Sequence, residues 1–321
     1  LKKGVRYFDY TASGLAYAPI ERRIAKYLKT YANTHSESAS NALKTQKRYE
    51  KARQRLKDAL GLDERFYLIS AGCGATGAIK KFEEIMGLYL PPMSANRLGE
   101  ERLKGANLPL VIISPYEHHS NEIRLCEVVR IPLSKSGEIN FGRLDQLLKI
   151  NSKREIIGSF SAASNVTGII SDYKKIYVMM KRYGATVAFD AASFSSHDNL
   201  DADYFDALFL SPHKLLGGVG SCGLLAIRKE LVKSDKPTFA AGGTVSYVSR
   251  SSHFFAPSVE RTEEGGTQHV MGLIRAALAY RLRNEVGLDV IKSREDELAR
   301  QFCEGLDKIP EVVSYCPRGV P

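Results

Sequence analysis

The sequence predicts an α/β fold, in which helices cover both faces of a mostly parallel, seven-stranded sheet. One observation behind this prediction is a series of short apolar runs, each bounded by turn residues. These runs are Phe66–Ser70, Leu110–Ser114, Glu127–Ile131, Ile156–Phe160, Thr186–Asp190, Ala207–Leu210 and Gly223–Ile227. A second observation is that amphipathic stretches separate several of the runs. Apolar strands that alternate with helices are typical of a parallel sheet buried on both sides.

The helices of this part of the chain are predicted from periodicity and from their end residues. The first begins near Pro19, because proline suits the first turn of a helix. A basic amphipathic helix runs from about Asn41 to Leu60 and ends at Gly61, a residue suited to closing a helix. The amphipathic stretches between strands include Gly74–Met86, Arg143–Ile150 and Asp172–Tyr183.

The C-terminal part of the sequence has a different pattern, since the succession of strands stops after about Lys233. A long helix is expected next, and a second helix begins near Leu288. Val312–Tyr315 is predicted as a core strand that ends at Cys316. The face that the long helix buries is expected to contain Met271, Ile274, Leu278 and Leu282.

Two domains are therefore expected. Residues 15–240 form the large domain, and residues 1–14 and 241–321 form an N-terminal segment with a small α+β domain. The small domain is expected to be incomplete, because the chain starts without methionine and stops just after its predicted strand.

Composition and charge are those of an ordinary globular protein. The 321 residues are 44% hydrophobic and 26% charged, which allows a substantial core. No apolar run approaches the roughly 18–20 residues that span a bilayer, and the first residues lack a secretory signal, so a cytoplasmic location is expected. The net charge of +10 is concentrated on the solvated face of the basic helix, without a nucleic-acid-binding motif. Nucleic-acid binding is therefore not expected.

A glycine-rich segment, Gly72–Gly77, follows the first predicted strand and opens a helix. Backbone N–H groups at such a helix start attract a phosphate, together with the helix dipole. The spacing also satisfies GxGxxG, but a dinucleotide site needs an acidic residue about 20 positions later, at the end of the next strand. Residues 89–93 have neither an acid nor a strand signal. The segment therefore predicts a phosphate cradle and not a nicotinamide site.

Two charged residues follow later strands of the predicted sheet. Lys214, in Ser211–Lys214, is placed to form an imine with an aldehyde, although a surface loop lysine explains the tetrapeptide alone equally well. Asp190 closes its strand and is either a helix cap or a site anion. Both belong to the carboxyl ends of strands, where open α/β sheets bind their ligands.

Two further segments, Glu117–Asn121 and Ser164–Gly168, also follow predicted strands. The adjacent histidines of the first segment predict no metal site, because neighbours on one loop rarely both coordinate and no third ligand is evident nearby. Stacking of His118 on an aromatic cofactor, or proton transfer by it, suits the position better. Asn165 offers an amide donor, but the second segment read alone is an ordinary turn.

The order of these segments resembles the class V aminotransferase superfamily of pyridoxal-5′-phosphate (PLP) enzymes, which have fold type I, the aspartate aminotransferase-like fold. This superfamily includes cysteine desulfurases and selenocysteine lyases. The resemblance covers nearly the whole chain, and its most specific parts are Glu117–Asn121 and Ser211–Lys214. Its other parts are Asp9–Ser13, Ala32–Ser36, Gly242–Thr244 and Glu264–Thr267.

The resemblance implies a role for each candidate residue. Lys214 would be the Schiff-base lysine, Asp190 would pair with the pyridine nitrogen, and His118 would stack on the ring. These three are the candidate catalytic residues. Thr267 would contact the phosphate bound by the second subunit of a homodimer. The remaining candidates are Asn165 and Ser193 near the phenolic oxygen, and Ala75, Thr76, Ser211 and His213 as phosphate ligands.

The sequence departs from the family at two places. Desulfurases usually have Asp-Gly-Ala-Gln where this chain has Asp190–Ser193, and a serine supplies no amide donor. Their nucleophilic cysteine and substrate-binding arginine are expected after Pro321, since Cys316 and Arg318 come too early. Cys73, inside the predicted phosphate loop, would be a poor persulfide carrier.

The leading hypothesis is a PLP enzyme that acts on a small amino acid through a Schiff base on Lys214, with cleavage of a C–S or C–Se bond. One alternative is transamination, which needs no cysteine nucleophile. Another is a non-catalytic scaffold of the same fold in sulfur transfer. The expected partners are the amino acid, a second copy of the chain and, in sulfur transfer, an acceptor protein.

Overall fold

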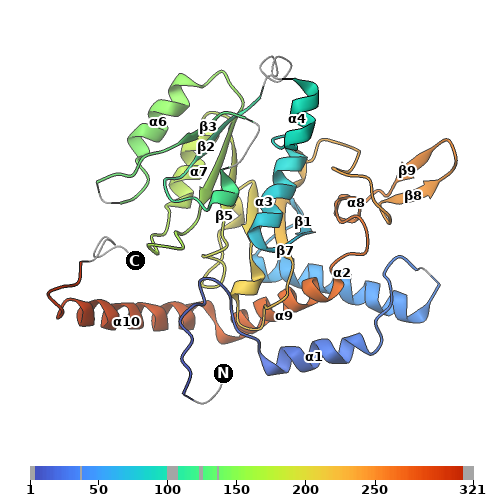
Figure 1. The fold of residues 1–321 in the computed structure, drawn as a ribbon, viewed down its shortest axis with the longest axis horizontal. Helices are drawn as coiled ribbons and strands as arrows, with labels where there is room; N and C mark the ends of the chain where they lie inside the picture. Colours follow the sequence, from blue (N-terminus) through green and yellow to red (C-terminus); the bar gives the residue numbers. More distant parts are fainter. Residues whose placement is uncertain (1–3, 37, 100–107, 123–125, 136, 314–321) are drawn as a thin grey trace.

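The computed structural model describes residues 4–36, 38–99, 108–122, 126–135 and 137–313, and a seven-stranded sheet forms its centre (Figure 1). The strands lie in the order β1-β7-β6-β5-β4-β2-β3. β7 is antiparallel to both of its neighbours, whereas the other neighbouring strands are parallel. The predicted fold class is confirmed. The strands are β1 (Phe66–Ala71), β2 (Leu110–Ile113), β3 (Val128–Arg130), β4 (Ile156–Ser161), β5 (Thr186–Asp190), β6 (Ala207–Leu210) and β7 (Gly223–Arg228).

Most helices begin and end close to the predicted positions. Pro19 lies in the first turn of α1, and Gly61 closes α2 with a φ of +68°, in the left-handed region that favours glycine. Asn140 and Asp172 cap α6 and α7, since each side chain accepts a hydrogen bond from a backbone N–H three residues later. Within the described residues, the α-helices are α1 (Ala18–Leu28), α2 (Ser40–Leu60), α3 (Gly74–Ile85), α4 (Pro92–Leu98), α6 (Phe141–Ile150), α7 (Tyr173–Lys181), α8 (Val259–Glu263), α9 (Val270–Val286) and α10 (Leu288–Leu306).

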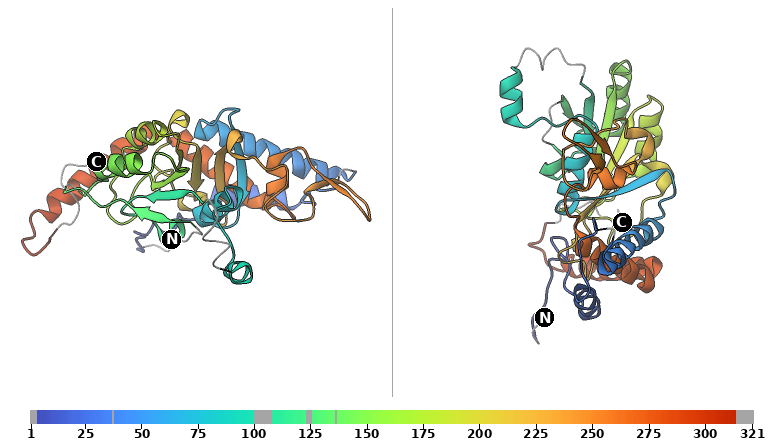
Figure 2. Two further views of the ribbon diagram at one scale, coloured as in Figure 1. Left: turned by 90° about the horizontal axis from the view of Figure 1, so that it is seen from above. Right: turned by 90° about the vertical axis from the view of Figure 1, so that its right-hand side faces the viewer.

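Both faces of the sheet are buried. Consecutive side chains of a strand point to opposite sides of the sheet, so a buried strand contributes to two core clusters. In β5, Val187 and Phe189 belong to one core cluster and Ala188 belongs to the other. The first cluster includes apolar side chains of α2, α6, α7 and α9, and the second includes those of α3. Figure 2 shows the helices on either side of the sheet.

The main sheet ends with β7, and after Lys233 the structure has a two-stranded antiparallel hairpin that was not predicted, formed by β8 (Val245–Val248) and β9 (His253–Phe255). The hairpin projects from the body of the molecule (Figure 1). Its aromatic pair, Tyr247 and Phe254, is exposed to 54% and 63%. The sequence shows no buried apolar run here, since the hairpin contributes almost nothing to the core. The short helix α4 was also not predicted, and it buries none of its residues.

The prediction for the buried face of α9 is only partly right. Ile274 is buried, whereas Met271, Leu278 and Leu282 are only partly buried against the core. The fully buried positions include Leu273 and the small residue Ala276. α9 packs along α2, and small residues allow two helices to approach closely, so large apolar residues alone did not identify this face.

α10 follows α9, extends away from the sheet and buries none of its residues (Figure 1). Val312 and Val313 lie in no strand, and the rest of the strand predicted at Val312–Tyr315 lies outside the described residues, as do Cys316 and Arg318. The domain division between residues 240 and 241 stays a prediction. In the described part of the chain, every helix is too short or too polar to cross a membrane.

Candidate active site

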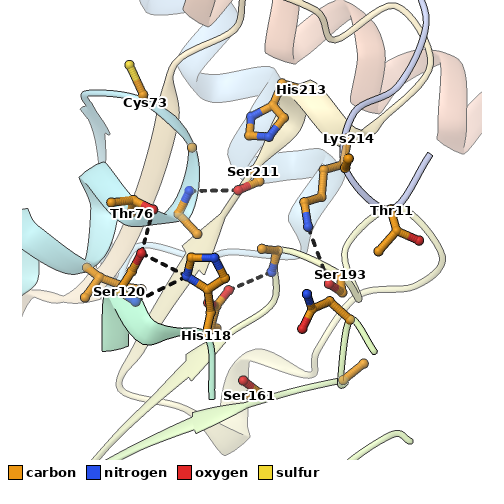
Figure 3. A pocket seen from close by; sticks show the side chains of 18 of the residues that line it. Thr11, Cys73, Thr76, His118, Ser120, Ser161, Ser193, Ser211, His213 and Lys214 are labelled. Atoms are coloured by element: carbon orange, nitrogen blue, oxygen red, sulfur yellow. Dashed lines mark hydrogen bonds between the residues drawn. The ribbon is translucent and has the colours of Figure 1, made fainter. Parts of the chain in front are cut away.

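A cavity of about 430 Å³ lies beyond the carboxyl ends of β4, β5 and β6 (Figure 3). Parallel strands deliver side chains to this edge of the sheet, which is where the sequence placed the site. The cavity is large enough for a small cofactor. All of the predicted site residues except Thr267 line it, namely Ala75, Thr76, His118, Asn165, Asp190, Ser193, Ser211, His213 and Lys214.

Lys214 belongs to η3 (Pro212–Lys214), a single helical turn directly after β6. Its Nζ donates a hydrogen bond of 3.5 Å to Oγ of Ser193 (Figure 3). Burial lowers the pKa of Lys214, and the carboxylate of Asp190 opposes part of this shift. A lowered pKa increases the fraction of neutral amine, which is the nucleophilic form.

Asp190 is the last residue of β5, and only 6% of it is exposed. The carboxylate accepts a hydrogen bond of 2.8 Å from the backbone N–H of Ala192. Burial raises the pKa of Asp190 to about 6, and the neighbouring Glu117 adds to the effect. Such a carboxylate is poorly solvated in the protein alone, and a cation in the cavity would stabilise its charge.

The segment before α3 forms a cradle with the loop after β6. Gly74 has a φ of +57°, and the backbone N–H of Ala75 donates a hydrogen bond of 2.7 Å to Oγ of Ser211. A Cβ atom on Gly74 would lie 2.7 Å from Cε1 of His213. The first turn of α3 and the side chains of Ser211 and His213 therefore enclose a small polar space, which fits a phosphate group.

Replacing Gly74 with alanine is expected to displace the ring of His213 and to weaken phosphate binding about tenfold, the equivalent of one lost hydrogen bond. Gly61 is the matched control, because its φ is also positive but a Cβ there meets no atom within 4 Å. Both variants should lose about 1 kcal/mol of stability from the left-handed conformation. Titration with inorganic phosphate tests this prediction, and equal affinities in the two variants would contradict it.

Glu117 fixes the segment that carries His118. One carboxylate oxygen accepts a hydrogen bond of 2.6 Å from the backbone N–H of Ser161, at the end of β4. The other accepts from Oγ of Ser161 at 2.9 Å and from the side-chain amide of Asn121 at 2.7 Å. The sequence alone did not reveal this role, because it depends on a contact between residues 44 positions apart.

His118 lies at the cavity wall with the ring of His119 4.1 Å from its own ring. Burial lowers the pKa of His118, and the nearby His119 and Lys214 lower it further, while Glu122 raises it. At neutral pH the ring is therefore mostly uncharged, which suits stacking on an aromatic group. Among the described residues, no group of three or more His, Cys, Asp or Glu side chains is arranged to hold a metal ion.

Thr267 lies outside this cavity, where its Oγ1 accepts a hydrogen bond of 3.2 Å from the side chain of Asn33. The segment before it is anchored by Glu264, a buried carboxylate that forms a salt bridge of 2.7 Å with Arg53. Glu264 also accepts a hydrogen bond of 2.6 Å from the backbone N–H of Ser70, close to the glycine-rich segment Gly72–Gly77. The contact of Thr267 with a second subunit stays a prediction.

The N-terminal segment contributes to the site, and no chemical role had been predicted for it. Asp9, Thr11 and Ala12 line the cavity. Gly14 fixes the path of the segment, because its N–H donates a hydrogen bond of 2.8 Å to the carbonyl of His213 and a Cβ there would clash with the backbone of Leu215.

A family model described as aminotransferase class V matches residues 93–319. The chain is 30% identical to a probable cysteine desulfurase of Pyrococcus abyssi, over 100% of this chain and 77% of the relative. It is 27% identical to a cysteine desulfurase of Synechococcus elongatus, over 95% of this chain and 47% of the relative. The chain thus spans about half the length of several curated relatives.

Solved structures show the same similarity. The apo cysteine desulfurase of Thermococcus onnurineus superposes with a TM-score of 0.80 and 25% identity, over 98% of this chain and 76% of that chain. The cysteine desulfurase CsdA of Escherichia coli superposes with a TM-score of 0.74 and 21% identity, over 96% of this chain and 75% of that chain. The second similarity establishes the fold alone.

Proposed function

This chain belongs to the class V aminotransferase family, and on that basis we propose that it is a PLP-dependent enzyme that removes sulfur from L-cysteine. The relatives named above support the reaction, since they are cysteine desulfurases. The observation that carries the proposal is that one cavity contains a lysine amine, a buried carboxylate and a phosphate cradle.

The residues of the cavity fit PLP. PLP supplies an aldehyde that joins covalently to an amine, and a pyridinium ring that withdraws electrons from a substrate carbon. Lys214 would hold the aldehyde carbon, and the carboxylate of Asp190 would accept a hydrogen bond from the ring nitrogen. Ala75, Thr76, Ser211 and His213 would bind the phosphate, while Asn165 and Ser193 would face the phenolic oxygen.

Three residues of the site have separate roles in the proposed reaction. The amine of Lys214, whose pKa is lowered by burial, would take a proton from the α-carbon of a bound amino acid. Ser193, which accepts a hydrogen bond from Lys214, orients that amine in the protein alone. His118 would cover one face of the cofactor and exclude water from it.

L-Cysteine turnover tests the proposed reaction directly. With PLP, L-cysteine and an excess of a small thiol, the protein should release one alanine and one sulfide for each cysteine. One thiol takes the sulfur atom as a persulfide, and a second thiol reduces this persulfide to sulfide as the two thiols join in a disulfide. Lys214→Ala serves as the inactive control. A keto acid formed without sulfide would establish transamination instead. PLP binding without turnover of any amino acid would support the non-catalytic scaffold.

The remaining predictions concern the protein in its surroundings. A homodimer would bring Thr267 to the phosphate site of the neighbouring subunit. Thr267→Val should then lower the affinity for PLP. Comparing the molecular mass of the variant and of wild type in solution separates this effect from an effect on dimer formation. A sulfur-acceptor protein and a cytoplasmic location stay predictions.

A further inference from the structure

Three side chains from two segments form a hydrogen-bonded chain along the cavity wall (Figure 3). Oγ1 of Thr76 lies 2.9 Å from Oγ of Ser120, and this Oγ lies 2.9 Å from Nδ1 of His118. Thr76 is in the first turn of α3, at the phosphate cradle. The chain therefore connects a group that would bind phosphate with the imidazole that would lie against the cofactor ring.

The backbone sets the direction of this chain at His118. The N–H of Ser120 donates a hydrogen bond of 3.2 Å to Nδ1, so we assign the proton of the neutral ring to Nε2. With Nδ1 as an acceptor, the hydroxyl of Ser120 donates to it as well. The hydroxyl of Thr76 in turn donates to Ser120, because each hydroxyl has a single proton.

A bound phosphate would reverse the chain. Phosphate oxygens act as hydrogen-bond acceptors, so the hydroxyl of Thr76 would donate its hydrogen bond to one of them instead of to Ser120. Oγ1 of Thr76 would then accept from Ser120, and Oγ of Ser120 would offer a lone pair to His118. A proton on Nδ1 would then be opposed by one hydrogen-bond donor, the backbone N–H of Ser120, instead of two, so the pKa of His118 would rise.

From this geometry we propose that Ser120 is a positioning residue that makes the protonation of His118 depend on phosphate binding at Thr76. The inference rests on the proposed function, since the phosphate is that of PLP. Among the described residues, the titratable groups that act on His118 do not depend on Ser120: they are His119, Lys214 and Glu122, and Asp190 lines the same cavity. Cofactor binding would bring the ring closer to the pKa at which it exchanges protons most effectively.

NMR titration of His118 in the PLP-free protein tests the proposal, with inorganic phosphate as the probe and chloride at equal ionic strength as the control. Without phosphate, the neutral ring should be protonated at Nε2. Saturating phosphate should raise the pKa of His118 in wild type by about 0.5–1 unit more than in Ser120→Ala, the equivalent of one hydrogen bond. The variant retains the backbone N–H and the direct attraction between phosphate and imidazolium.

Two further variants separate the hydroxyl chain from a general effect on the loop. Ser120→Thr keeps the hydroxyl and should restore the wild-type response. Thr76→Val removes the other end of the chain and should behave like Ser120→Ala once phosphate is saturating. An equal response in wild type and Ser120→Ala would overturn the proposal, as would a neutral ring protonated at Nδ1. Failure of the proposed function would show differently, as the lack of sulfide release with PLP and L-cysteine.

Discussion

Replacing Lys214 with alanine is expected to abolish turnover of L-cysteine, with a loss of at least about a thousandfold. The variant would lose both the covalent anchor of PLP and the amine that moves the substrate proton, and such groups contribute factors of this size. The visible absorption band of lysine-bound PLP should also disappear. Inorganic phosphate should still bind, because Ala75, Ser211 and His213 are unchanged.

Lys214→Arg is the matched control for charge. An arginine keeps the positive charge beside Asp190, but its guanidinium stays protonated and is no nucleophile. The arginine variant should therefore be as inactive as the alanine variant. A small amine added to the alanine variant should restore part of the turnover. Retention of the visible band in Lys214→Ala would show that another lysine carries the cofactor.

Residues at strand ends could be located from the sequence because their position follows from local pattern. Lys214 follows and Asp190 closes a short apolar run bounded by turn residues, which is typical of a buried strand, and parallel strands end at one edge of a sheet. Gly61 and Asp172 likewise have local signals for helix ends. The family resemblance then related these positions to the chemistry of PLP.

Contacts between distant segments could not be located in the same way. The hydrogen bonds that join Glu117 to Ser161, and Ser120 to Thr76, depend on how the sheet and α3 pack. The glutamate and serine were visible in the sequence as parts of a motif, but nothing in their spacing specified their partners. The prediction of the buried face of α9 was only partly right for a related reason. Ala276 is buried because α9 packs against α2, and the sequence of α9 alone does not indicate this contact.

Replacing Asp190 with asparagine is expected to have opposite effects on activity and on stability. Turnover should fall at least about a hundredfold, because the carboxylate that would keep the ring nitrogen protonated is lost. The PLP-free protein, by contrast, should become more stable at pH 8. A neutral amide avoids the desolvation that raises the pKa of this buried carboxyl, and its oxygen can still accept from Ala192.

The pH dependence gives the sign of this effect. The pKa of Asp190 is about 6 in the folded protein and 3.8 as its ordinary value. A folded-state pKa above the unfolded value means that this carboxyl contributes stability below about pH 4, which is lost as the pH rises through about 6. The loss amounts to roughly 3 kcal/mol at pH 8. The stability of Asp190→Asn should not fall in this way between pH 4 and pH 8.

Urea unfolding of the PLP-free wild type and variant between pH 4 and pH 8 measures this difference. Asp206 provides the control, because it is also a buried carboxylate but forms ion pairs of 3.0 Å with Lys181 and 3.2 Å with Arg228. Asp206→Asn should destabilise the protein at pH 8, since it leaves those cations without their partner. If Asp190→Asn were also less stable than wild type at pH 8, Asp190 would be a structural anion. A gain in stability together with lost turnover would instead identify a carboxylate retained for the cofactor at the expense of the fold.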